Sequence, residues 1–454
     1  MTELIRIKDT KTWVAKGVDC GANSTTCILT FSHSGNTSLG TISAGDKPVG
    51  VIAMSSWIAP DCSAMGKVTD ESLTPITEAQ CEIDPISGVQ DITITVKGQA
   101  VLHSVAFTDK KPYADMVYTP VPEKNLVDLA SDTWEATDML GRKVASVEDV
   151  KGKTREHKVG IFYWTWQEAH AHLRPVDVTN VLDKYPAAEY SKDHPAWGER
   201  PFQCFWHEPF YGFYRNSDPY IIRHHMALLA AAGVDMIAFD CTNGALLWRD
   251  AYEPLFKGMH EARLDGIRTP QIVFMLNLGI VPESTTAMLY SLYQNLYKPG
   301  LYSDLWYCQD GKPVIMAYDS VLPEKGVCET DDRILREIKE FFCFRPGQPG
   351  YGCGTWHPNQ WGWLEIFPQH KYCERPDGTC EMMTVGVGQN ANKDRICTHF
   401  NDVGTFGRSY TYKHGHDLLT KDSYKYGYNV HGCVFDELLG QPNRKLFDVM
   451  TKGS

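Results

Sequence analysis

The sequence predicts an α/β protein in which a small β-sandwich domain precedes a (β/α)8 barrel of the TIM type. Up to about residue 130, short apolar or alternating runs are separated by turn residues and show little helical periodicity. From Val159 onward, short apolar runs alternate with stretches of helical periodicity, as expected for buried parallel strands joined by helices. We therefore expect a β-sandwich-like domain over 1–130, a linker over 131–158 and a barrel domain over 159–454.

Three segments of the N-terminal part have the pattern of β-strands. Residues 92–96 alternate strictly between Ile or Val and Thr, and Lys97-Gly98 follows them. Residues 25–31 and 49–54 are apolar runs flanked by Gly, Ser and Asn. Short strands with turn residues between them are typical of a β-sandwich. A domain of this kind either binds carbohydrate itself or supports the barrel.

The polar stretch 131–158 has few apolar residues that could anchor it, so it is predicted to be a linker. The clearest helix–strand unit begins after it, at Asp218-Pro219. Asp is a favoured N-cap residue and Pro is favoured at the first helical position. Gly233 stands where a left-handed residue would end the helix. Residues 234–239 then form a buried strand that ends at Asp240.

The same alternation continues through the rest of the chain. Strands are predicted at 159–164, 202–206, 271–276, 313–318, 354–367 and 382–387, and helices at 251–264, 284–297 and 331–342. Such a series forms either a doubly wound sheet or a closed barrel. No Gly-rich phosphate loop follows the first strand, which disfavours a dinucleotide-binding fold.

Composition excludes several classes of function. The formal net charge is −12 and no basic stripe is present, which argues against nucleic acid or an anionic membrane as the main partner. The longest apolar runs, 226–233 and 234–239, are far shorter than the roughly 20 residues of a membrane-spanning helix, so no membrane insertion is expected. No signal peptide is visible. The chain is therefore expected to be extracellular or periplasmic if a leader was removed, and cytoplasmic otherwise.

Metal sites and Ser nucleophiles have little support in the sequence. Four histidines, His170, His172, His224 and His225, lack the HExxH spacing, and no GxSxG motif occurs. None of the 14 cysteines forms a CxxC pair. Cys373 and Cys380 bracket a turn and either form a disulfide or remain thiols. We expect no metal and no cofactor.

Polar and aromatic side chains follow nearly every predicted barrel strand, where a barrel enzyme places its chemistry. Asp240 follows strand 234–239, and Glu365 lies in the aromatic segment WGWLEIF, where apolar neighbours would raise its pKa. Glycoside hydrolysis needs two such carboxyl groups, so Asp240 and Glu365 are the predicted catalytic pair. The predicted substrate-binding residues are Trp164, Trp166, His170, His207, Glu208, Asn243, Asn277, Asp319, Trp361 and Gln389.

Each of these assignments has a structural alternative. Asp240 would also serve as the N-cap of the next helix, and Glu365 as an outward-facing acid. Glu208 would also serve as an ion-pair partner. His207 is more typical of a hydrogen-bonding wall residue than of a proton shuttle.

Three segments resemble a group of bacterial barrel proteins that are similar to glycoside hydrolase families 71 and 99, endo-acting α-glucanases and α-mannosidases. They are GIFYWTW, FWHEPFYGFYRNSDPYIIRHHMALLAAAGVDMIAFDCTNG and NLYKPGLYSDLWYCQDGKPVIM, and the resemblance runs from about residue 132 to 428. It implies a (β/α)8 barrel that uses carboxylates without metal or cofactor. It also implies that Asp240 and Glu365 lie on the catalytic face, without saying which is the acid. The two adjacent catalytic glutamates of family 99 have no match in this chain.

The chain departs from its relatives after residue 428, where the segment NVHGCVFDELLGQPNRKLFDVMTKGS replaces a helix and a Trp-Asn-Glu-Trp type motif. The barrel is therefore either closed in an unusual way or incomplete at its C-terminal end. The leading interpretation is a metal-independent glycoside hydrolase that cleaves a polysaccharide or glycan. The alternatives are a catalytically impaired carbohydrate-binding protein on a barrel scaffold, and a carbohydrate lyase or epimerase.

Overall fold

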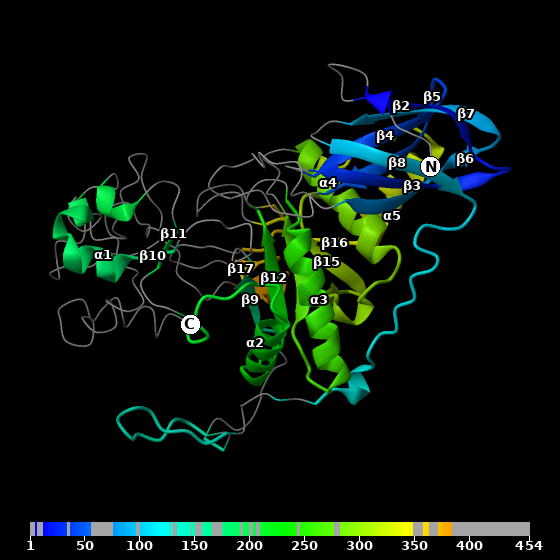
Figure 1. The fold of residues 1–454 in the computed structure, drawn as a ribbon. Coiled ribbons are helices and arrows are strands. Elements are labelled where there is room, and N and C mark those ends of the chain that lie inside the picture. Colours follow the sequence, from blue (N-terminus) through cyan, green and yellow to red (C-terminus); the bar gives the residue numbers. More distant parts are fainter. Residues whose placement is uncertain are drawn as a thin grey trace. The chain divides into compact units, whose positions relative to one another are not determined.

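The computed structural model describes residues 5–6, 12–33, 37–55, 76–96, 100–127, 129, 134–146, 148–149, 157–165, 175–190, 194–198, 203–205, 209–242, 246–276, 282–347, 357–362 and 371–383 (Figure 1). The chain falls into two compact units. The first joins Met1–His172 with Pro209–Phe344, and the second joins Leu173–Glu208 with Arg345–Ser454. The first unit contains both an antiparallel and a parallel sheet.

The antiparallel sheet of the first unit wraps around a single apolar core, as in a sandwich or a barrel. Its order among the described strands is β1-β2-β7-β4-β5-β6-β3-β8. Buried and partly exposed residues alternate along β3, and the inward side chains meet in a core that includes Leu29, Phe31, Ile42 and Ile94. The strands are β1 (Ile5–Arg6), β2 (Thr12–Asp19), β3 (Ser24–His33), β4 (Ser38–Ala44), β5 (Lys47–Met54), β6 (Thr77–Ile86), β7 (Val89–Val96) and β8 (Ala100–Thr108). The strands predicted at 25–31, 49–54 and 92–96 are confirmed.

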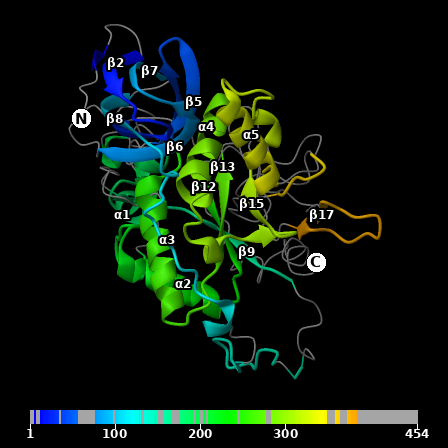
Figure 2. The same cartoon turned by 90° about the vertical axis from the view of Figure 1, so that its right-hand side faces the viewer.

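The parallel sheet follows the chain in order. Its parallel strands pair as β9-β12-β13-β15-β16, in the order in which they occur along the chain, and the short β14 pairs antiparallel with β15. Figure 2 labels four of these strands, β9, β12, β13 and β15. The strands are β9 (Gly160–Tyr163), β12 (Met236–Cys241), β13 (Gln271–Leu276), β14 (Cys308–Gln309), β15 (Lys312–Met316) and β16 (Cys343–Phe344). This order does not reverse among the described strands, whereas a doubly wound sheet reverses at its switch point.

The helices between these strands pack on one face of the sheet. They are α2 (Pro219–Ala231), α3 (Arg249–Leu264), α4 (Pro282–Leu292), which continues into the π-helix η6 (Tyr293–Tyr297), and α5 (Glu329–Phe341). Alternate strand residues such as Ile237, Phe239 and Cys241 share a single core with all of these helices. The residues between them point to the opposite face and are also at most 7% exposed: Ala238, Asp240, Val273, Met275, Val314 and Met316.

Helix α2 begins and ends where its sequence predicts. The Asp218 carboxylate accepts the backbone N–H groups of Tyr220 and Ile221 over 2.9 and 3.4 Å, which makes Asp218 the N-cap. After the helix, Gly233 has a φ of +75°, a conformation in which glycine bears no Cβ penalty. The short connection then delivers the chain to β12.

A buried amide joins the two sheets of the first unit. Gln294, in η6, donates from Nε2 to the Val51 carbonyl over 3.0 Å and accepts the Ala53 N–H at Oε1 over 3.2 Å. Strand β5 pairs with β6 only at Gly50, so the Gln294 amide takes the place of a neighbouring strand along the rest of that edge. Lys298 and Glu82 add an ion pair of 3.0 Å across the same joint.

Several strands that were expected in the barrel are not part of the parallel sheet. Segment 202–206 was expected to contribute a barrel strand, but β11 (Gln203–Phe205) pairs with β10 (Pro175–Asp177), and β12 pairs directly with β9. Within the strand expected over 354–367, the described residues 357–362 form no strand, and the rest of that segment lies outside the described residues. Residues of the expected strand 382–387 instead form a hairpin, in which β18 (Met382–Met383) pairs antiparallel with β17 (Lys371–Tyr372).

The hairpin turn carries Cys373 and Cys380, whose sulfurs are not joined in a disulfide, so the disulfide alternative is wrong. The second unit also contains α1 (Val178–Lys184).

Candidate active site at the carboxyl end of the parallel sheet

The chain brings two features to the edge where the parallel strands end. Because each helix runs back antiparallel to the strand before it, the start of α2 lies at the edge where β9 and β12 end. A side-chain contact supports this placement: the Asn216 amide, just before α2, donates to the carbonyl of Trp164, just after β9, over 3.4 Å. The two features are the acid Asp240 and an aromatic loop that precedes α2.

Asp240 occupies an apolar row of the sheet. It pairs in register with Met275 of β13, and Met275 pairs with Met316 of β15, so these three side chains lie at one level on the face away from the helices. Asp240 is only 4% exposed. Its Oδ1 accepts the backbone N–H of Thr242 over 2.9 Å. Burial raises the pKa of the Asp240 carboxyl above its usual range, and the hydrogen bond from Thr242 only partly opposes this effect.

The structure does not support the alternative role of Asp240 as a helix cap. Helix α3 begins at Arg249, and its N-cap is Trp248, eight positions after Asp240. The Asp240 carboxylate instead receives the N–H two residues later, within its own turn. A buried carboxyl group with a raised pKa is suited to hold a proton and to donate it.

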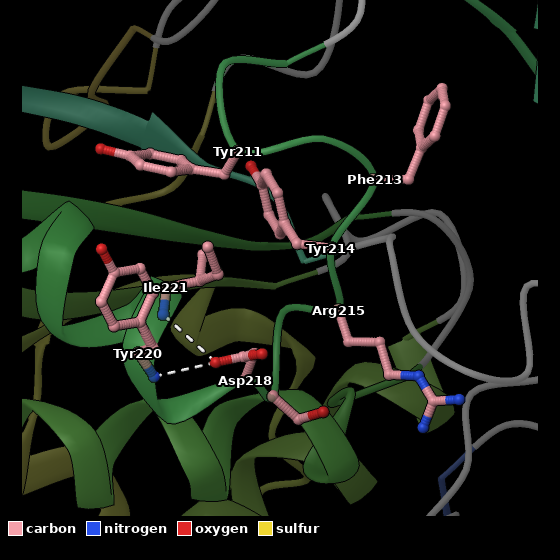
Figure 3. Close-up of a pocket in the computed structure, with 8 residues that line it drawn as sticks. Tyr211, Phe213, Tyr214, Arg215, Asp218, Tyr220 and Ile221 are labelled. Atoms are coloured by element: carbon pink, nitrogen blue, oxygen red, sulfur yellow. Dashed lines mark hydrogen bonds between the residues drawn. The ribbon is translucent and has the colours of Figure 1, made fainter.

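The aromatic loop forms an open pocket of about 520 Å³ with the first turn of α2 (Figure 3). The ring of Tyr214 lies between those of Tyr211 and Phe213 in this view, and Arg215 extends away from the Tyr220 ring. The residues that line the pocket are Tyr211, Phe213, Tyr214, Arg215, Ser217, Asp218, Tyr220 and Ile221. Phe213 is 59% exposed and Tyr220 is 65% exposed, so each presents apolar ring surface to solvent.

Two histidines on α2 pack against the aromatic rings of the loop and of Tyr220. His224 stacks on Tyr220 at a centroid distance of 5.8 Å and meets Tyr211 edge-on at 5.0 Å. His225 meets Tyr214 edge-on at 5.4 Å, and its Nδ1 lies 3.1 Å from the hydroxyl oxygen of Tyr163 at the end of β9. Burial lowers the pKa of His225, which favours its neutral form. The rings are therefore held by helix α2 and strand β9 together.

The aromatic loop is not among the predicted site residues. Most of those residues follow predicted strands, whereas the loop precedes a helix. A signal was present, since residues 209–220 (PFYGFYRNSDPY) contain five aromatic residues in twelve positions.

The other predicted site residues have different environments. Trp164 follows β9 and is 52% exposed, as a platform for a sugar ring requires. Asp319 is exposed in a 3₁₀ turn (Asp319–Val321) after β15. Trp361, in the second unit, is 5% exposed, and its indole N–H donates to Glu381 over 2.8 Å, which leaves little ring surface for a ligand. The remaining candidates lie outside the described residues: Trp166, His170, His207, Glu208, Asn243, Asn277, Glu365 and Gln389.

Within the described ranges, no group of three or more His, Cys, Asp or Glu side chains is arranged to hold a metal ion. No described helix is both long enough and apolar enough to cross a membrane.

Comparison with known proteins gives weak structural similarities. No family model and no curated protein matches the chain. A GH99 endo-α-mannosidase from Bacteriodes thetaiotaomicron is 17% identical over 42% of this chain and 52% of its own, with a TM-score of 0.25. A family 6 carbohydrate-binding module from Clostridium cellulolyticum, in complex with xylose, is 16% identical over 22% and 74%, with a TM-score of 0.16.

A glycoside hydrolase family 43 arabinoxylan arabinofuranohydrolase from Bacillus subtilis, in complex with cellotetraose, is 13% identical over 23% of this chain and 20% of its own, with a TM-score of 0.17. The solved structures with weak similarity thus include glycoside hydrolases and carbohydrate-binding modules. At these TM-scores none of them carries an inference about this chain.

Proposed function

We propose that this chain is a glycoside hydrolase that binds its glycan at the carboxyl end of the parallel sheet. The observation that carries the proposal is Asp240, a carboxyl group with a raised pKa in a row of methionines at the end of β12. In this reaction a protonated carboxyl donates its proton to the leaving glycosidic oxygen, while a second carboxyl attacks the sugar or activates water. We assign the first role to Asp240.

Glu365, which lies outside the described residues, is our proposal from the sequence alone for the second carboxyl group, with the part of nucleophile or base. The sequence favoured Glu365 as the general acid, because its apolar neighbours were expected to raise its pKa. The present assignment gives that role to Asp240 instead. The burial of Asp240 supports this assignment, because burial in an apolar row raises the pKa of its carboxyl, as a general acid requires.

The exposed aromatic rings supply the proposed binding surface. The C–H face of a pyranose is apolar and packs on a flat ring, while its hydroxyls need polar partners. Trp164, Phe213 and Tyr220 offer exposed rings at the edge where Asp240 lies. Sequential parallel strands with helices on one face also support our proposal that the sheet belongs to a (β/α) barrel, whose active site is built at this edge.

The test is a panel of defined oligosaccharides incubated with the wild-type chain and with Asp240→Asn, with products identified by mass spectrometry. Hydrolysis by the wild type that is lost in Asp240→Asn would support the proposal. Asp310→Asn is the matched control, since Asp310 is an exposed acid in the turn that precedes β15. Unsaturated products would indicate a lyase instead, and binding without product would indicate a carbohydrate-binding protein.

A further inference from the structure

We infer that the aromatic pocket at the start of α2 takes an acidic sugar, with the Arg215 guanidinium binding the sugar carboxylate. This inference rests on the proposed function, since it assumes that the pocket binds carbohydrate. It adds the class of sugar and the residue that selects it.

The charges that line the pocket do not cancel one another. Among the described residues that line it, Arg215 and Asp218 are the charged ones. Asp218 is already engaged, because it accepts two backbone N–H groups at the start of α2, where the helix dipole is positive. The negative charge of Asp218 is therefore balanced by the helix, whereas the positive charge of Arg215 has no partner within the part of the chain that the structure describes.

The guanidinium of Arg215 is exposed and forms no hydrogen bond or ion pair with any of the described residues. Most arginines on the helices of the first unit differ in this respect, although Arg336 of α5 is, like Arg215, without an ion pair among the described residues. Each of four others pairs with a carboxylate: Arg223 with Asp265, Arg249 with Glu253, Arg263 with Glu123 and Arg333 with Glu82. Arg215 is thus a cation that lines the same pocket as the exposed rings, with its guanidinium extended away from the Tyr220 ring (Figure 3).

A uronic acid fits both kinds of surface. Its planar carboxylate matches the two parallel N–H donors of a guanidinium, and its pyranose ring matches the aromatic faces. The pocket volume of about 520 Å³ lies within the range of small-molecule sites. Arg215 is the one cationic residue among the described residues that line the pocket, and the chain has a net charge of −12. A nucleic acid backbone is held by many cations, so the pocket does not suit it.

The experiment compares matched pairs of oligosaccharides by titration calorimetry. Each pair consists of an oligouronate and its fully methyl-esterified form, prepared from galacturonate, glucuronate and mannuronate, so that only the charge differs. For at least one pair, we expect the wild-type chain to bind the acid about tenfold more tightly than the ester.

Arg215→Gln should remove this preference, because the acid loses its counterion whereas the ester loses at most a neutral hydrogen bond, and Arg215→Lys should retain part of it. Arg336→Gln is the control, because Arg336 is an exposed arginine on α5 that does not line the pocket. Equal binding of acid and ester, unaffected by Arg215→Gln, would overturn the inference, as would binding of neutral oligosaccharides alone, and both results would leave the proposed function intact. If none of the sugars, acidic or neutral, is bound, both proposals fail.

Discussion

The backbone N–H of Thr242 donates to Oδ1 of Asp240 over 2.9 Å, so the turn that follows β12 holds the carboxylate at the end of that strand. The carboxyl group therefore has a fixed orientation before any substrate arrives. Its neighbours in the same row, Met275 and Met316, provide no charge to offset its burial. Burial in the sheet therefore raises the pKa of this acid.

Asp240→Asn should lower kcat by about 10²- to 10⁴-fold on any substrate that the panel identifies, because the amide cannot donate the proton of a general acid. Thr242 can still donate to the Asn side-chain oxygen, so the fold should be retained. Circular dichroism and kcat measured on the same preparation check both expectations. A kcat within threefold of wild type would contradict the role of Asp240.

Asp240 should also make stability depend on pH. Its pKa is raised in the folded state above the roughly 3.9 of an unfolded chain, so the folded state binds more protons between the two values. This contribution to stability is therefore full below the unfolded pKa and is lost as the pH rises through the folded pKa. Asp240→Asn and wild type should have similar unfolding midpoints near pH 3, and the variant should gain on wild type as the pH rises to 7. Thermal unfolding across this range measures the difference, and a constant difference would contradict the prediction.

Local signals made much of the parallel sheet predictable. The strand predicted at 271–276 coincides with β13, and Asp218 and Gly233 bound α2 as expected, because caps and left-handed glycines act within a few residues of themselves. Segment 202–206 was placed in the wrong sheet because an aromatic-rich run does not specify its partner. Its partner, β10, is distant in sequence and was not predicted.

The candidate site was likewise predictable from the sequence only in part. Asp240 was selectable because it ends a strongly apolar strand, and its catalytic role stays a prediction. The environment that raises its pKa was not readable, since Met275 and Met316 reach the same row only through strand register. Likewise, the support of Tyr211 and Tyr220 by His224 depends on the path of a loop across a helix.

Asp218→Ala should destabilise the first unit by about 1 kcal/mol, because two N–H groups at the start of α2 lose their acceptor. Asp218→Ser keeps a capping oxygen and should recover most of the loss. Urea denaturation of the two variants and wild type gives the comparison. Equal losses in the alanine and serine variants would show that the cap is not the cause.

Gln294→Leu should cost roughly 2–4 kcal/mol, because the Ala53 N–H and the Val51 carbonyl lose their partner in a buried place. Gln90→Leu is the matched control, since the Gln90 amide donates a hydrogen bond to the Ser87 carbonyl at the exposed surface. This substitution should change the free energy of unfolding by less than about 0.5 kcal/mol. Chemical denaturation measures both. Similar small losses in the two variants would mean that the amide does not hold the two sheets together.

Gly258→Ala should destabilise the protein although alanine is the better helix former. A Cβ at position 258 would lie 2.5 Å from Cγ2 of Ile222, where α2 packs against α3. The helix propensity gained is about 1 kcal/mol, whereas overpacking typically costs about 1–3 kcal/mol, so we expect a net loss. Ile222→Leu removes the Cγ2 branch, so the double variant should be more stable than the sum of the two single changes predicts. A double-mutant cycle from urea denaturation measures this coupling, and strict additivity would mean that the two helices separate to accommodate the new methyl group.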